Sequence, residues 1–118
     1  MASLYAQFVK ETVNWETLED EDSFSTYEIQ RVGPVSCLKI IEMYVAPHAR
    51  GNDKWRELSD KLEEIAKQEK CKTISAQISK STSEFTQQRT AHLCRLFGMT
   101  LTYEDIYQII YSRNVKYE

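Results

Sequence analysis

The sequence is poor in the residues that mark secreted, fibrous or metal-binding proteins. Its 118 residues include only three cysteines, three glycines, two prolines and two histidines. Cys37, Cys71 and Cys94 are an odd number at wide spacing, which fits neither a disulfide framework nor a zinc site. We therefore expect three reduced, mostly buried thiols in a reducing compartment, and no metal.

Long apolar runs and an excess of basic charge are also missing. No run reaches the roughly 18 residues that a membrane-spanning helix needs. Residues 1–10 lack the basic start and long apolar stretch of a signal peptide, so we expect no membrane association and a cytoplasmic location. The net charge is −3 and the pI is near 5.5, which disfavours a nucleic-acid binder.

What is present is an ordinary globular composition, 42% hydrophobic and 28% charged. We expect residues 1–118 to form a single domain with one modest core. Apolar spacing predicts a short helix over 4–13, and the acidic stretch 16–23 is interpreted as a solvated loop. Strands over 24–32 and 37–45, separated by a Gly-Pro turn, should form a hairpin.

Helix and strand then alternate. A helix over 53–69 has one apolar face, which includes Trp55 and places its indole in the core. A strand over 72–78 completes a βαβ unit, whose two strands should be parallel. A capping box at 81–84 begins another helix, Gly98 ends it, and the tail predicts one or two strands that separate near Asp105.

This order of elements, together with two motifs, resembles the GNAT family of N-acetyltransferases. Residues 44–51, Tyr-Val-Ala-Pro-His-Ala-Arg-Gly, are similar to the family's V-x-P-x-x-R-G strand end and loop. Residues 96–99, Leu-Phe-Gly-Met, resemble the L-G-F near its last helix. The resemblance covers roughly residues 24–112. It implies an α+β fold with a GNAT-like mixed sheet flanked by helices, trimmed at its N-terminus.

The resemblance also implies where acetyl-CoA would bind. The family writes Q/R-x-x-G-x-G/A at a helix start, where backbone N–H groups hold the pyrophosphate. The corresponding residues here are Arg50, Gly51, Asn52, Asp53, Lys54 and Trp55. Asp53 and Trp55 replace the two glycines, so we expect acetyl-CoA to bind weakly or not at all. The backbone near Tyr44 and Val45 is implied to hold the thioester carbonyl.

The implied reaction is acetyl transfer to an amine, which needs a base and an acid. Cys94 stands where the family often has a tyrosine that acts as the acid. Glu42, in strand 37–45, is a candidate base, and His92 is a second. Each also has a structural interpretation: a packed thiol, a solvent-reaching carboxylate and a satisfied core histidine.

Two functions remain open at this point. The first is an acetyl-CoA-dependent N-acyltransferase whose acceptor is an unidentified amine or protein. The second is a catalytically inactive GNAT-fold binding or structural protein, for example a virion or host-directed factor of a tailed phage, which the short length and the altered loop favour. A phage source would place the protein in the virion. An exposed final strand also suggests a homodimer formed by edge addition.

Overall fold

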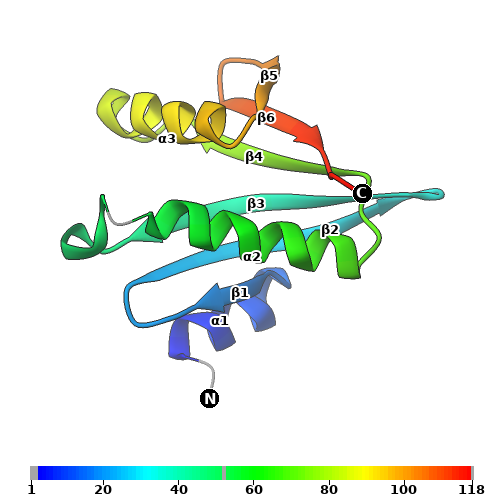
Figure 1. The fold of residues 1–118 in the computed structure, drawn as a ribbon, viewed down its shortest axis with the longest axis horizontal. Coiled ribbons are helices and arrows are strands. Elements are labelled where there is room, and N and C mark those ends of the chain that lie inside the picture. The colour runs from blue at the N-terminus through cyan, green and yellow to red at the C-terminus, as the bar shows by residue number, and fades with distance from the viewer. Residues whose placement is uncertain (1–2, 52, 118) are drawn as a thin grey trace.

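The computed structural model describes residues 3–51 and 53–117, which fold around one six-stranded mixed sheet (Figure 1). The strand order across the sheet is β1-β2-β3-β4-β6-β5. No helix among the described residues is long and apolar enough to cross a bilayer. In chain order the elements are α1 (Leu4–Val13), β1 (Glu16–Glu19), β2 (Ser23–Val32), β3 (Val35–Val45), the 3-10 turn η1 (Pro47–Ala49), α2 (Lys54–Gln68), β4 (Thr73–Ser79), α3 (Glu84–Leu96), β5 (Thr100–Glu104) and β6 (Gln108–Asn114).

The centre of the sheet follows the sequence prediction. β2 and β3 pair antiparallel around a turn in which Gly33 takes a φ of +61°, a conformation that suits glycine. β3 and β4 are parallel, and α2 connects them. The expected α+β architecture, a hairpin followed by a βαβ unit, is therefore confirmed.

The core lies between the sheet and the helices α2 and α3. α2 buries Leu58, Leu62 and Ala66, which follow one another at four-residue spacing on one helical face. The sheet contributes the alternating residues of its central strands, above all Leu38, Ile40, Ile74, Ala76 and Ile78. The helix α1 stands apart from this core and packs near β1 (Figure 1).

Two expectations about the edges of the sheet are corrected. Residues 16–19, expected to be part of a solvated loop, form the edge strand β1. Glutamates are tolerated there because an edge strand is partly exposed, while Leu18 packs against the core. At the opposite edge the outermost strand is β5, not the final strand β6, and all five β5 residues are exposed. A dimer formed by edge addition on this side of the sheet would therefore use β5.

An irregularity in β3 determines the geometry of the site. Thr26 pairs with Glu42, whereas the next residue, Tyr27, pairs with Ile40, so Ile41 is an extra residue in β3. Such a bulge bends the strand and reverses the alternation of side chains beyond it. Even-numbered residues of β3 face the core before the bulge, and odd-numbered residues face it afterwards.

Candidate active site

A wedge opens between the carboxyl-terminal ends of β3 and β4. Their pairing ends at Ile40↔Ala76, although β3 continues to Val45 and β4 to Ser79. Two cavities of about 50 and 480 Å³ lie in this wedge. The two cavities share five lining residues, which come from β3, β4 and α3: Ile41, Glu42, Met43, Gln77 and Thr90.

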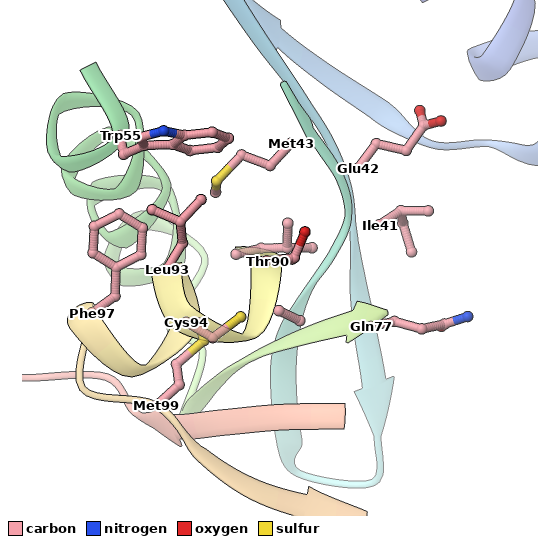
Figure 2. Close-up of a pocket in the computed structure, with 12 residues that line it drawn as sticks. Ile41, Glu42, Met43, Trp55, Gln77, Thr90, Leu93, Cys94, Phe97 and Met99 are labelled. Atoms are coloured by element: carbon pink, nitrogen blue, oxygen red, sulfur yellow. The ribbon is translucent and has the colours of Figure 1, made fainter. Parts of the chain in front are cut away.

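The two sides of the wedge differ in chemistry. Figure 2 shows apolar side chains gathered on the side of α2 and α3: Trp55, Met43, Leu93, Phe97 and Cys94. Ile41, Glu42 and Gln77 point the opposite way (Figure 2). The smaller cavity is therefore an apolar slot beneath the helices, with a carboxylate across the strand from it.

Glu42 is held in place by two neighbouring hydroxyl groups. The Thr26 hydroxyl donates a hydrogen bond to its Oε1 atom at 2.9 Å, and the Tyr5 hydroxyl donates another to the same oxygen. Since both bonds end on Oε1, Oε2 is the oxygen that can take up a proton. The Glu42 backbone carbonyl also accepts a hydrogen bond from the Ser25 hydroxyl at 2.8 Å. Glu42 is thus a positioned carboxylate at the edge of the wedge.

Three aromatic rings stand beside this carboxylate. The Tyr5 ring lies 5.7 Å from the Phe24 ring, and Phe24 lies 5.9 Å from Tyr44, measured between centroids. Burial, the hydrogen bond to Glu42 and the charge of Glu42 together raise the pKa of Tyr5 to about 12. Tyr5 therefore remains a neutral donor to Glu42 at physiological pH.

The start of α2 keeps the backbone shape of a glycine-rich loop. Gly51 has a φ of +91°, and Asp53, the N-cap of α2, has a φ of +59° and a ψ of +16°. Asp53 is exposed, and its side chain makes no capping hydrogen bond. Asn52, which the family pattern places in the cofactor loop, lies outside the described residues. The first glycine position of the family pattern thus keeps the left-handed conformation but carries a carboxylate.

The two basic residues of this loop are already engaged. The Arg50 side chain donates from Nε to the Val45 carbonyl at 2.9 Å and lies over the Tyr44 ring, 5.5 Å from its centroid. The Lys54 ammonium lies 3.1 Å from the carboxylate of Asp20. Backbone hydrogen bonding, then Lys54, lowers the pKa of Asp20 to about 2. Lys54 would therefore have to leave Asp20 to meet a phosphate.

Trp55 is not part of the buried core, which corrects the sequence prediction. Its indole is partly exposed and lines the apolar slot together with Leu93 and Phe97. The guanidinium of Arg89, in α3, lies 5.7 Å from the centre of the indole. Trp55 occupies the second glycine position of the family pattern, so its ring bridges α2 and α3 where the family has little or no side chain.

The predicted acid and the second predicted base lie in different surroundings. Cys94 is buried and lines the slot, and burial raises the pKa of its thiol to about 11. The thiol is therefore protonated near neutral pH. His92 is exposed on α3 and is not among the residues that line the wedge. The structure brings Cys94 and Glu42 to one opening and leaves His92 outside it.

Tyr44 and Val45, expected near the thioester, lie in the part of β3 beyond its last pair with β4. Sequence reasoning missed Tyr5, Ile41 and Gln77. The sequence predicts a helix around Tyr5 but gives no sign that Tyr5 lies beside Glu42. The bulge that sets the direction of Ile41 leaves no signal in the apolar run of β3.

Among residues 3–51 and 53–117, no group of three or more His, Cys, Asp or Glu side chains could hold a metal ion.

Solved structures share this fold. A protein classed as a GNAT-family acetyltransferase, from Desulfovibrio desulfuricans, aligns over 93% of this chain and 78% of its own, with a TM-score of 0.70 and 15% identity. A protein classed as an acyl-CoA N-acyltransferase, from Klebsiella pneumoniae, aligns over 96% of this chain and 85% of its own, with a TM-score of 0.70 and 14% identity. A protein classed as an acetyltransferase, from Salmonella typhimurium and solved with its cofactor acetyl-CoA, aligns over 94% of this chain and 70% of its own, with a TM-score of 0.63 and 13% identity.

Other matches are longer than this chain, which spans 58% of nourseothricin acetyltransferase. No family model matches the sequence, and none of the curated proteins matches it. The structural likeness nevertheless shows that the chain has the GNAT fold, in agreement with the resemblance in its motifs.

Proposed function

We propose that the protein is an N-acyltransferase that moves an acyl group, acetyl in the simplest case, from a coenzyme A thioester to an amine. The observation that carries this proposal is the wedge between β3 and β4, which places an apolar slot and a positioned carboxylate on opposite sides of one bulged strand.

The residues of the wedge fit a thioester arm. The slot is apolar and narrow, and the adjoining end of β3 has left its pairing with β4, so its backbone groups can meet a carbonyl. The start of α2 supplies the N–H groups of a helix terminus for the phosphates. Asp53 opposes that contact, and we therefore expect weak binding rather than none.

Within this arrangement each side chain has a definite task. The bound thioester supplies an activated acyl carbon and a thiol leaving group. Glu42 takes a proton from the acceptor ammonium at Oε2 while Tyr5 and Thr26 hold Oε1. Trp55 and Met43 cover the slot and exclude water. The Cys94 thiol is a protonated group within the slot, and proton donation to the leaving group is the role we propose for it.

A direct test measures the product. The protein at high concentration is incubated with millimolar acetyl-CoA and a panel of primary amines, and amide formation is followed by mass spectrometry. Changing Glu42→Gln should lower the rate by about 100-fold or more, the usual worth of a general base. The matched change Glu64→Gln removes a carboxylate from an exposed position on α2 and should leave the rate unchanged.

Two outcomes would contradict the proposal. Equal rates for the unmodified protein and Glu42→Gln would remove the carboxylate from the mechanism. Absence of both amide formation and NMR shifts at the wedge with millimolar acetyl-CoA would favour the inactive binding or structural protein instead.

A further inference from the structure

The larger cavity of the wedge has a lining with one sign of charge. It has a volume of about 480 Å³, and Glu42 is the charged side chain among its described lining residues. No lysine or arginine borders it within the described part of the chain. The remaining walls are the rings of Phe24 and Tyr44, the apolar side chains of Ile41, Met43 and Ile78, and uncharged polar groups.

The basic side chains next to this cavity already have partners. Arg50 is bound to the Val45 carbonyl and lies over the Tyr44 ring, 5.5 Å from its centroid, and Lys80 pairs with Glu104 at 2.7 Å. A carboxylate or phosphate on a ligand in this cavity would therefore meet Glu42 while these two cations are already engaged. Bringing an unpaired anion into such a partly closed space carries a large desolvation cost.

A cation meets the opposite conditions. The fixed carboxylate of Glu42 offers an ion pair, and the rings of Phe24 and Tyr44 form one wall of the same cavity with their centroids 5.9 Å apart. Ring faces attract ammonium groups, and their apolar surface also suits a carbon stem. Tyr5 supports two residues of this lining, since its ring lies 5.7 Å from Phe24 and its hydroxyl bonds Glu42.

We infer that this cavity binds the acceptor as a primary ammonium ion on an apolar stem, carrying a single positive charge and no anionic group. The inference rests on the proposed function and specifies its acceptor. The ammonium gives one proton to Glu42, and the freed nitrogen lone pair forms the amide bond. The carbon–sulfur bond of the acyl-CoA breaks, the departing sulfur takes a proton from Cys94 to become the free thiol, and the second nitrogen proton restores the Cys94 thiol. Binding and deprotonation thus use the same carboxylate.

The test measures binding without acyl-CoA, by two-dimensional NMR titration of the full chain with four related probes. They are 2-phenylethylamine, 2-phenylethanol, which lacks the charge, phenylalanine, which adds a carboxylate, and phenylalaninamide, which adds similar bulk without that negative charge. We expect 2-phenylethylamine and phenylalaninamide to bind about tenfold more tightly than the other two. Tight binding of phenylalaninamide would extend the acceptor class to peptide N-termini.

Two pairs of variants locate the effect. Glu42→Gln should remove the advantage of 2-phenylethylamine over 2-phenylethanol, whereas Glu64→Gln should keep it. Tyr44→Leu should weaken binding of the amine about five- to tenfold, the worth of a cation–π contact. Tyr107→Leu changes a tyrosine that is 73% exposed in the link between β5 and β6 and should have no effect.

Three results would overturn the inference. They are equal binding of the amine and the alcohol, binding of phenylalaninamide as weak as that of phenylalanine, and loss of amine binding in the control variants. A different result would contradict the proposed function. If an amine binds the cavity but is never acylated, the proposed function is wrong and the inference about the cavity still stands. Acylation of phenylalanine as readily as 2-phenylethylamine would remove this inference and leave the proposed function standing.

Discussion

Replacing Asp53 should strengthen the binding of acetyl-CoA, because its charge and not its backbone opposes the phosphates. Asp53 already has a φ of +59°, in the left-handed region where glycine and asparagine are at ease. Asp53→Asn therefore removes the charge while keeping the conformation. Asp53→Gly removes the charge and the side chain together.

The size of the effect follows from the exposure of the site. Two unit charges about 4 Å apart in water-like surroundings repel by about 1 kcal/mol, which corresponds to roughly fivefold in Kd. We expect Asp53→Asn to gain this factor. Asp53→Gly should gain somewhat more, since the backbone N–H groups can then approach the phosphates closely. Asp53→Ala should gain affinity but lower the free energy of unfolding by about 1 kcal/mol, because alanine disfavours positive φ.

The assay is calorimetric titration with acetyl-CoA at low and physiological salt, with thermal unfolding of each variant beside it. The unmodified protein should bind in the millimolar range, and the gain from Asp53→Asn should shrink as salt screens the charge. Asp60→Asn, an exposed carboxylate further along α2, serves as the matched control. Micromolar binding by the unmodified protein, or an unchanged Kd in Asp53→Asn, would refute this reasoning.

Three further predictions concern the wedge. Trp55→Ala should lower the free energy of unfolding by about 2 kcal/mol in denaturant titration, less than for a core tryptophan, because its ring opens onto the slot and leaves no closed cavity. In an ultraviolet pH titration, Tyr5 should ionise near pH 12, in a step that Tyr5→Phe abolishes. Folding raises the pKa of Tyr5 above 10.0, so its stabilising effect should be full below pH 10 and lost as the pH rises towards 12. Cys94 should resist thiol reagents at pH 8 in the folded protein and react on unfolding; rapid native labelling would contradict its burial.

The sequence predicts the middle of the fold well because its signals are strong there. The apolar run of β3 and the helical face of α2 each have one structural solution, and the Gly-Pro turn sets the hairpin between β2 and β3. β1 was missed because three of its four residues are polar or charged, as an exposed edge strand allows. Pairing with β2 forms that strand, and local pattern cannot reveal such pairing.

The candidate site was predictable only in part. Glu42 was found because a carboxylate in an apolar strand is conspicuous, and the start of α2 was found through a motif. Tyr5 was not found, because it reaches Glu42 through tertiary packing across 37 residues of sequence. Trp55 was assigned to the core because its helical spacing matches Leu58. Periodicity places a residue on a face but does not show that this end of the helix overlies an opening.

Ile41 makes the chemistry of the wedge depend on strand register as well as on the identity of its residues. Because it is one residue without a partner in β2, a slip that paired Ile41 with Thr26 would remove the bulge and turn every later side chain of β3 to the other face of the sheet. The carboxylate of Glu42 would then point under the helices, and Met43 would point to the open side. Deleting Ile41 would instead restore an unbroken ladder with Thr26 still opposite Glu42, so Glu42 and Met43 would keep their sides.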